Sequence, residues 1–386
     1  MHIVEIPSFS PPYGGEFCFE QAKALKALGH EVRVISNVQL GLKLNASHYL
    51  KMPYGRFWHE VDGIEIYQSY QRGLPKVIRP NVKRWVGIVR SMFGDYVKKH
   101  GMPDVLHAHC AKWAGYAAMM ISKEHGVPYV ITEHLSAPLY EAEFGPAPSK
   151  AWQVALLREA YQHAAMVVPV AEELVAAMAP YFGKDYRWTP ISNLIDTDYF
   201  CYRPRTLVEG QPFHFCCIAN FLPLKGYDVL FQAFRILSAD KDAILSVAGP
   251  GTNSEACKKM AKEAGIGTRV RFLGRLSKSA VRDLLYYANT LVLASRSEVQ
   301  PLVLLEAMST GIPVVATEVT PASLRIEGGC HIVPTDDAEA MAKAMAQVMT
   351  GTVDGALLSE KIKALASPDV VARQLERVFQ AAIDRA

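Results

Sequence analysis

Short apolar runs alternate with helix-length segments along almost the whole chain, and this alternation constrains the fold more than any other feature. The expected strands cover 2–6, 29–35, 104–109, 128–134 and 166–170 in the first half, and 213–220, 243–248, 269–272, 290–294 and 314–316 in the second. Strands that alternate with helices imply parallel sheets, since a parallel neighbour needs a crossover connection. The sequence therefore predicts an α/β fold.

The length of the chain predicts more than one domain. The 386 residues exceed what a single hydrophobic core usually organises. Both halves show the same alternation and no short-period repeat, which favours two doubly wound, Rossmann-like domains that face each other. Ligands of open α/β sheets bind outside the carboxyl ends of the strands. We therefore expect the site in a cleft between the two domains.

The composition excludes several classes of protein. Half of the residues are hydrophobic and a fifth are charged, as in a globular chain. The seven cysteines are odd in number and show no Cys-x-x-Cys spacing, which favours reduced thiols in a cytoplasmic protein and no metal site. The first residues enter a strand pattern directly, without the pattern of a secretory signal, and no apolar stretch is long enough to span a membrane.

Residues 298–317 carry the most specific functional pattern. Glu298 and Glu306 lie eight positions apart, and Pro301 between them is placed as at a helix start. Gly311 is placed as at a helix end, and 313–317 read as the next buried strand. A free helix N-terminus favours an anion, and a nearby carboxylate accepts hydrogen bonds from a sugar diol. This arrangement predicts a site for a phosphorylated ligand that bears hydroxyl groups.

The whole string resembles the motif of the retaining family 4 glycosyltransferases, which have the GT-B fold. The family pattern is Glu-x7-Glu-Ala-Met-x2-Gly-x-Pro-Val-Val-Ala-Thr, and this chain matches it closely from Glu298 to Thr317. The resemblance covers nearly the whole chain and is strongest over 213–317. It implies an acceptor-binding domain at 1–195, a nucleotide-sugar-binding domain at 196–366, and a C-terminal helix at 367–386 that crosses back to the first domain.

The resemblance also implies a role for each residue of the motif. Glu306 would bind the ribose hydroxyls of the donor, and Glu298 would hold hydroxyls of the transferred sugar. The backbone amides around Pro301–Val303 would face the diphosphate, with Leu302 and Val303 as the N–H donors, because proline has none. Arg275 and Leu276, which follow the strand at 269–272, would flank the nucleobase.

Lys225-Gly226 resembles the Arg-x4-Lys-Gly phosphate clamp of the family, in which cations stabilise the leaving diphosphate. Such electrostatic stabilisation is often the largest catalytic contribution. Here Asn220 occupies the position of the arginine. An amide donates hydrogen bonds without a charge, so another cation could substitute, the amides and Lys225 could suffice, or turnover could be weak.

Two glycine turns resemble ligand-binding loops of the family. Gly14-Gly15 precede the helix expected over 16–28, and glycine lets the backbone approach the phosphates or the donor sugar closely. The pair does not match Gly-x-Gly-x-x-Gly, which disfavours a dinucleotide oxidoreductase. The turn at 248–251 resembles a loop near the nucleotide, and a purely structural turn is an equal alternative.

Three histidines and a glutamate end two neighbouring strands of the first half. The resemblance places His109 at the donor sugar, as a catalytic residue with Lys225 and Glu298. We expect His107 to be a hydrogen-bonded core residue. Glu133 and His134 are candidates for acceptor contact, with a structural pairing to the loop as the alternative.

Residues 72–99 form a basic stretch with interleaved aromatic residues. Eight cations stand against one carboxylate, Asp95. A basic amphipathic helix over 76–99 could contact an anionic membrane from the cytoplasmic side, which would suit a lipid-linked acceptor. The alternative is a domain helix whose apolar side packs on the sheet. Nucleic-acid binding is disfavoured, because no recognised module accompanies the charge.

Together these features predict a retaining hexosyltransferase for surface polysaccharide or glycolipid synthesis. We expect a UDP-sugar donor, with a GDP-sugar next, a glycan or lipid-linked acceptor, and neither a cofactor nor a metal. A non-catalytic nucleotide-sugar-binding partner of a biosynthetic complex is one alternative, favoured by Asn220. A GT-B nucleotide-sugar epimerase is another, although such enzymes lack this Glu-x7-Glu string.

Overall fold

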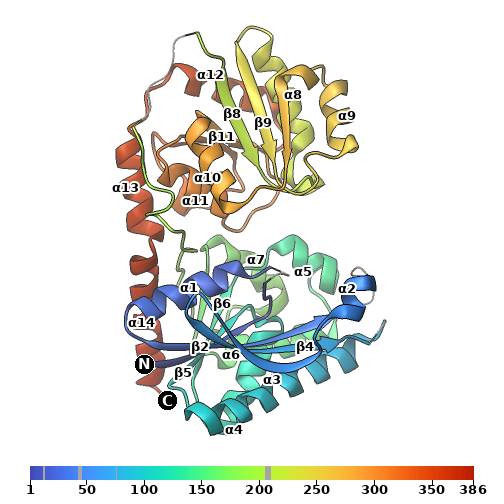
Figure 1. The fold of residues 1–386 in the computed structure, drawn as a ribbon, viewed down its shortest axis with the longest axis vertical. Helices are drawn as coiled ribbons and strands as arrows, with labels where there is room; N and C mark the ends of the chain where they lie inside the picture. Colours follow the sequence, from blue (N-terminus) through green and yellow to red (C-terminus); the bar gives the residue numbers. More distant parts are fainter. Residues whose placement is uncertain (12–13, 42–45, 75, 205–209) are drawn as a thin grey trace. The chain divides into compact units, whose positions relative to one another are not determined.

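The computed structural model describes residues 1–11, 14–41, 46–74, 76–204 and 210–386. The chain divides into two compact units (Figure 1). Unit 1 comprises Met1–Leu194 together with Pro368–Ala386, and unit 2 comprises Ile195–Ser367. Each unit is built around its own sheet, and the two Rossmann-like units confirm the predicted α/β, GT-B class.

Unit 1 contains a seven-stranded sheet in the order β3-β4-β2-β1-β5-β6-β7. Its strands are β1 His2–Pro7, β2 Glu31–Leu40, β3 Gly55–Val61, β4 Ile64–Arg72, β5 Val105–His109, β6 Tyr129–Glu133 and β7 Met166–Pro169. All neighbours are parallel except β3, which pairs antiparallel with β4. The β3–β4 hairpin has no counterpart among the strands expected from the sequence.

Eight α-helices lie in the described part of unit 1. They are α1 Glu16–Ala27, α2 Ala46–Lys51, α3 Ile78–His100, α4 Tyr116–His125, α5 Ala137–Phe144, α6 Trp152–His163, α7 Glu173–Phe182 and α14 Pro368–Ile383. The last of these comes from the C-terminus and lies beside α1 (Figure 1). Val371, Leu375 and Phe379 of α14 belong to the same buried cluster as Ile3 and Leu25. The C-terminal helix is therefore part of the core of unit 1.

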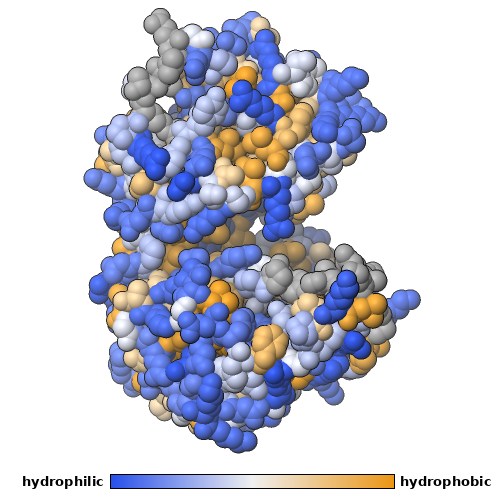
Figure 2. Space-filling view, viewed as in Figure 1, coloured by the Kyte–Doolittle hydropathy of each residue, from blue (hydrophilic) through white to orange (hydrophobic). Residues whose placement is uncertain are grey.

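Helix α3 is the basic amphipathic helix expected from the sequence, and its apolar face is buried within unit 1. Trp85, Val89, Phe93 and Tyr96 are all buried, and α3 contacts β2 and α4. Over unit 1, Figure 2 shows mostly hydrophilic residues, with apolar residues in separate patches. This face of α3 is thus unavailable for insertion into a membrane, and the packing alternative is correct for the body of the helix.

Unit 2 contains a fully parallel six-stranded sheet in the order β10-β9-β8-β11-β12-β13. Its strands are β8 Phe213–Ile218, β9 Ala243–Ala248, β10 Val270–Gly274, β11 Thr290–Leu293, β12 Val314–Thr317 and β13 Cys330–Val333. Its α-helices are α8 Tyr227–Ser238, α9 Glu255–Glu263, α10 Lys278–Tyr287, α11 Leu302–Ser309, α12 Ala338–Thr350 and α13 Gly355–Ala366. The edge strand β13 was not expected from the sequence.

In each sheet, the direction of winding reverses beside the first strand. In unit 2 the chain runs β8, β9, β10 to one side and then returns to β11, which pairs with β8 on the other side. In unit 1, β5 likewise pairs with β1 on the side opposite β2. Such reversal points are where open α/β sheets bind ligands, because the loops after the two central strands diverge there.

Among the helices of the described ranges, none combines the length and the apolar character that crossing a bilayer requires.

Candidate functional site

The reversal point of unit 2 holds a close pair of opposite charges. Lys225 lies in the loop after β8, and Glu298 lies in the loop after β11. The Lys225 Nζ and the Glu298 Oε1 atoms are 2.6 Å apart, and both side chains are partly exposed. Both residues were predicted site residues, and the structure brings them together where a ligand of this sheet is expected.

A glycine explains why the two loops can meet. Gly226 adopts a left-handed conformation, with φ of 61°. A Cβ atom at this position would lie 1.9 Å from the carbonyl oxygen of Ala294, directly after β11. Only glycine permits this approach, so the position of Lys225 depends on Gly226. Gly226 lets the loop pack against the end of β11, and the preceding lysine thereby reaches Glu298.

Hydrogen bonds orient the Glu298 carboxylate. The Ser295 hydroxyl donates to the Glu298 Oε1 atom at 2.6 Å. Thr317, at the end of β12, donates its hydroxyl to the Ser295 carbonyl oxygen at 2.6 Å. Thr317, the last residue of the motif, thus stabilises the loop that carries Glu298, the first residue of the motif.

Helix α11 begins and ends as the motif predicts. Pro301 is its N-cap residue, and Leu302 and Val303 open its first turn, where backbone amides lack helical partners. The helix ends at Ser309, and Gly311 follows with φ of 84°. The structure therefore supplies the predicted helix N-terminus directly after the loop of Glu298.

Glu306 lies one turn inside α11 and is partly buried. Burial raises the pKa of its carboxyl group to about 7, and the nearby Lys278 ammonium opposes this shift only in part. A carboxyl group that titrates near neutral pH in a ligand-free site is typical of a functional position.

Asn220 is exposed at the start of the loop after β8, and its side chain carries no charge. The nearby cation that sequence reasoning missed is Arg296, two residues before Glu298. Its guanidinium donates to both carboxylate oxygens of Asp228, at 3.0 and 2.7 Å, and to Asp336 at 2.7 Å. Arg296 also donates to the Pro223 carbonyl oxygen. These contacts brace the Lys225 loop, so Arg296 does not replace the missing arginine of the clamp in this structure.

Arg275 and Leu276 follow β10, with Arg275 exposed and Leu276 packed against the core of unit 2. The neighbouring turn at 248–251 joins strand ends: Gly249 N donates to Gly274 O at 2.7 Å, and Phe221 N donates to Pro250 O at 2.8 Å. The turn at 248–251 therefore has a structural role, which was one of the two alternatives considered for it.

In unit 1, Gly14 and Gly15 connect β1 to α1 at the reversal point of the sheet. Their φ angles are 98° and 87°. A Cβ atom at Gly15 would lie 2.3 Å from the Phe9 carbonyl oxygen. The tight turn thus requires glycine at position 15, directly before the first residue of α1.

His109 shares a buried carboxylate with His107. In the sheet register, Glu5 of β1 lies opposite His107 of β5. The Glu5 Oε2 atom is 2.7 Å from His107 Nδ1 and 2.9 Å from His109 Nε2. The His107 Nε2 atom also contacts the Thr132 hydroxyl at 2.7 Å, and the residue is fully buried, as expected of a core histidine. His109 is likewise fully buried, so in this structure it presents no surface to solvent.

The pKa values of Glu5 and His109 are both lowered within this cluster. Burial alone would raise the pKa of Glu5, but the contacts with His107 and His109 outweigh it and lower the pKa to about 2. Burial and the neighbouring His107 lower the pKa of His109. His109 Nδ1 has no hydrogen-bond partner among the described residues, which leaves one ring nitrogen for another group.

Glu133 has the structural role that was the alternative to acceptor contact. It is fully buried, and its carboxylate accepts from the amides of Ala111, His134 and Leu135 at 2.9–3.0 Å and from the Tyr161 hydroxyl at 2.5 Å. Four donors occupy this carboxylate, which supports the structural alternative, and acceptor contact by Glu133 stays a prediction. Its neighbour His134 lies against Phe17 and His109, and burial holds its pKa well below the usual value.

Glu5, His107 and His109 are also a group whose side-chain types could hold a metal ion. The sequence spacing gave no sign of this cluster, because Glu5 is remote in the chain. The separations of 2.7 and 2.9 Å are those of hydrogen bonds. A hydrogen bond between His109 and Glu5 and a close approach of His107 to the same carboxylate hold the cluster together, and metal independence stays a prediction.

Two family models match the chain, one over each half. The model for Glycosyltransferase Family 4 matches residues 14–199, and the model for Glycosyl transferases group 1 matches residues 202–364. The chain belongs to the family 4 glycosyltransferases. Being a family 4 glycosyltransferase, it is a GT-B-type transferase, and the two models together cover both units.

Relatives in sequence agree with this family 4 assignment, and solved structures agree with the GT-B fold. The chain is 25% identical over 354 residues to a Bacillus subtilis protein designated as the teichuronic acid biosynthesis glycosyltransferase TuaC, covering 88% of this chain and 86% of that protein. It is 29% identical over 242 residues to the D-inositol 3-phosphate glycosyltransferase of Pseudarthrobacter chlorophenolicus, covering 57% and 56%. Among structures, it is similar to a sucrose-phosphate synthase of Thermosynechococcus elongatus (TM-score 0.79, 18% identity, full coverage of both chains). Anabaena HepE, solved with UDP and glucose, gives a TM-score of 0.73 at 15% identity, covering 99% of this chain and all of that one.

Proposed function

We propose that this family 4 glycosyltransferase is a metal-independent, retaining hexosyltransferase that uses a UDP-sugar donor. The observation that carries the proposal is the Lys225–Glu298 pair at the reversal point of the unit 2 sheet, directly before the N-terminus of α11. This place combines a cation, free helical amides and a carboxylate, which suit a diphosphate linked to a sugar.

The diphosphate binds at Lys225 and at the first amides of α11. As the bond between the sugar and the phosphate breaks, negative charge grows on the leaving diphosphate. A fixed ammonium and aligned amides stabilise that charge without reorganisation. The Lys225 ammonium is already held in place by Glu298 at 2.6 Å, so this stabilisation is preorganised.

The two carboxylates of the motif bind different hydroxyl groups of the donor. Glu306, deeper in α11, accepts from the ribose diol, and Glu298, before the helix, accepts from the transferred sugar. In this scheme Glu298 binds both Lys225 and the sugar. Its Oε1 atom accepts hydrogen bonds from Ser295 and Lys225, so its Oε2 atom can accept from the ligand.

Retention of configuration follows from same-face attack in this proposal. The departing phosphate accepts the proton of the acceptor hydroxyl while that oxygen forms the new glycosidic bond. The protein then contributes orientation and charge stabilisation, and neither a covalent nucleophile nor a cofactor takes part. The engagement of Glu298 by Lys225 and Ser295 supports this scheme, since a hydrogen-bonded carboxylate is a weaker nucleophile.

The acceptor is a glycan or a lipid-linked sugar of a surface polysaccharide or glycolipid, and the enzyme acts in the cytoplasm. The name of the Bacillus subtilis relative, which refers to teichuronic acid, supports a polysaccharide product. Anabaena HepE was solved in complex with UDP and glucose, and this complex supports the choice of UDP over GDP.

Release of UDP from a UDP-sugar without any acceptor tests the proposal against its alternatives. Slow release is expected of the transferase. Binding without release would favour the non-catalytic partner, for which the uncharged Asn220 is the supporting observation. Conversion of the sugar without its loss would indicate an epimerase.

A further inference from the structure

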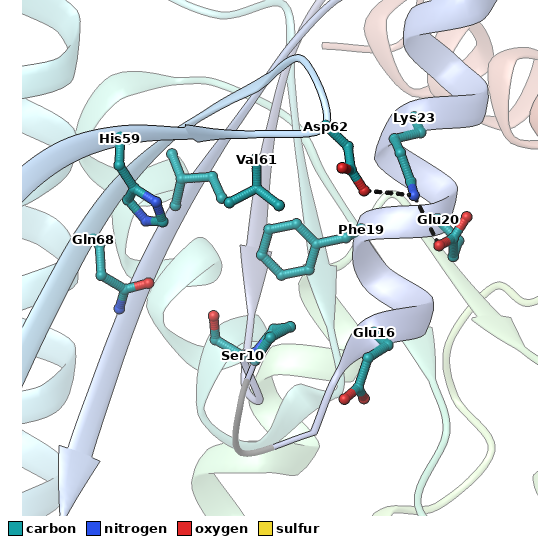
Figure 3. Close-up of a pocket in the computed structure, with 11 residues that line it drawn as sticks. Ser10, Glu16, Phe19, Glu20, Lys23, His59, Val61, Asp62 and Gln68 are labelled. Carbon is teal, nitrogen blue, oxygen red and sulfur yellow. Dashed lines mark hydrogen bonds and ion pairs between the residues drawn. The ribbon is translucent and has the colours of Figure 1, made fainter. Parts of the chain in front are cut away.

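Unit 1 contains a pocket of about 170 Å³ that the proposed donor site does not use (Figure 3). It lies between α1 and the β3–β4 hairpin, with Ser10 and Pro11 of the loop after β1 at one end. An apolar cavity of roughly 150 Å³ accommodates a benzene ring, so this pocket has room for one six-membered ring. Its size thus suits a single sugar unit.

One wall of the pocket is an aromatic ring. Phe19 of α1 projects toward the hairpin, opposite His59 and Val61 of β3 (Figure 3). The C–H face of a pyranose is apolar, and packing it on an aromatic ring removes apolar area from water. Phe19 therefore offers a platform for a sugar ring, and Ile66 adds a further apolar surface beside it.

The polar groups of the pocket suit hydroxyl groups. Gln68 is buried, and its Nε2 atom donates to the backbone carbonyls of Ser36 and Ser69 at 3.3 and 3.1 Å. These bonds orient the amide so that its oxygen points into the pocket, as does the Ser10 hydroxyl (Figure 3). The His59 Nε2 atom is buried and has no hydrogen-bond partner among the described residues. A buried polar atom of this kind is costly unless a ligand or water satisfies it.

The negative charge at the rim of the pocket disfavours an acidic ligand. Glu16, Glu20 and Asp62 contribute three carboxylates against the single ammonium of Lys23. Lys23 is already paired with Glu20 at 2.8 Å and with Asp62 at 3.2 Å (Figure 3). Burial lowers the pKa of His59, so its ring is neutral at neutral pH. A uronic acid or a sugar phosphate would meet net negative charge here and would be repelled.

We propose that this pocket binds one uncharged sugar ring of the acceptor, with its C–H face on Phe19 and its hydroxyl groups on Gln68, His59 and Ser10. The inference rests on the proposed function, and it adds that the acceptor presents a neutral sugar to unit 1. The location suits an acceptor next to the donor, because Glu16 lines the pocket and directly follows Gly14-Gly15, the turn expected to approach the donor sugar. The predicted donor carboxylates and Lys225 belong to unit 2.

Saturation-transfer NMR of the full-length protein with methyl glycosides at millimolar concentration tests the proposal. The probes are methyl glucoside, methyl N-acetylglucosaminide and methyl glucuronide. We expect at least one neutral glycoside to bind and the glucuronide not to bind. Gln68→Leu removes one acceptor and should weaken binding roughly five- to tenfold, as expected for one lost hydrogen bond. The matched control is Gln71→Leu, on the same strand but outside the pocket, and it should bind like the wild type.

A second variant guards against misfolding of Gln68→Leu. Val61 is 44% exposed at the rim, so Val61→Trp fills the pocket while leaving the hydrogen bonds of Gln68 in place. It should abolish binding of the neutral glycoside. Equal or better binding of the glucuronide, unchanged binding to Val61→Trp, or an equal loss in Gln71→Leu would overturn the proposal.

Acceptor-independent release of UDP by the wild type separates this inference from the proposed function. If the wild type releases UDP but binds none of the glycosides, the pocket assignment is wrong and the transferase stands. If the wild type neither binds UDP nor releases it from a UDP-sugar, the proposed function itself fails.

Discussion

Lys225 and Glu298 are 73 positions apart in the sequence, yet their Nζ and Oε1 atoms lie 2.6 Å apart between the two central strands of unit 2. The pair keeps a cation ordered in the ligand-free protein. A bound diphosphate brings more negative charge than one carboxylate, so it can share or take over the ammonium. The roles of Lys225 and Glu298 can therefore be tested by separate measurements.

Replacement of Lys225 by alanine should lower turnover on the order of 10²-fold or more, because it removes a preorganised charge stabiliser of the leaving group. UDP release from a UDP-sugar is the measurement. Lys259→Ala, on the exposed face of α9 and 75% exposed, is the control and should turn over normally. Near-normal turnover of Lys225→Ala would remove this residue from the clamp.

The Glu298→Gln variant should separate nucleotide binding from sugar transfer. It releases Lys225 from its partner, so calorimetric affinity for UDP should stay the same or rise. Turnover of the UDP-sugar should fall, because an amide accepts sugar hydroxyls less strongly than a carboxylate. Glu263→Gln, at a 66% exposed position, is the control. A loss of UDP affinity equal to the loss of turnover would contradict the assignment of Glu298 to the sugar.

Binding of UDP should depend on pH through Glu306, whose pKa is raised to about 7 by burial. The ionised carboxylate accepts the ribose hydroxyls more strongly, so affinity should rise between about pH 6 and pH 8. Replacement by glutamine should flatten this profile, and alanine should weaken UDP binding outright. Unchanged UDP affinity of Glu306→Ala would refute the ribose role.

The same residue has a predictable effect on stability. Its folded pKa of about 7 exceeds the unfolded value of 4.5, so the protonated form is favoured in the native state. This contribution is fully present below about pH 4.5 and is lost as the pH rises through about 7. Thermal unfolding of the ligand-free Glu306→Gln variant should therefore show a higher Tm than the wild type at pH 8, and little difference at pH 4. The reverse order would mean that the carboxylate is stabilised when ionised.

Replacement of Glu133 by glutamine should impair stability rather than acceptor recognition. Four buried donors lose their charged acceptor, which should cost on the order of 3 kcal/mol. The expected fall in Tm is roughly 6–12 °C. Glu141→Gln, on the exposed side of α5, is the control. A stable variant with a raised acceptor KM would support the acceptor role.

Membrane contact by the 76–99 segment should be electrostatic and confined to the start of α3. Ile78 is 60% exposed there, and the neighbouring Lys83 is exposed, whereas Arg84 and Arg90 are engaged by Gln71 and Glu124. We expect flotation with anionic liposomes at low salt, and its loss when Lys76, Arg79 and Lys83 are replaced by alanine. Wild-type protein that never floats would end this hypothesis.

The sequence predicted those features that depend on local pattern. The buried strands that the sequence predicted are short and predominantly apolar, and α11 begins and ends where Pro301 and Gly311 indicate. The β3–β4 hairpin was missed because neither strand forms an apolar run: β3 is exposed or half-buried throughout, and β4 contains several polar residues although most of it is buried. The edge strand β13 has only four residues.

Features that depend on register and on distant partners could not be read from the sequence. Glu5 meets His107 only because β1 and β5 pair in a particular register. Glu133 is occupied by Tyr161 of α6, and no local spacing relates these two residues. Arg296, by contrast, lies just before the recognised motif, two positions from Glu298, and its charge was a signal that could have been weighed.

A crystal structure of the protein soaked with a UDP-sugar tests the central claim most directly. The account predicts density for the diphosphate within hydrogen-bond distance of Lys225 Nζ and the first amides of α11, with the ribose hydroxyls on Glu306. Density for the nucleotide elsewhere, with the Glu306 carboxylate facing solvent, would contradict it.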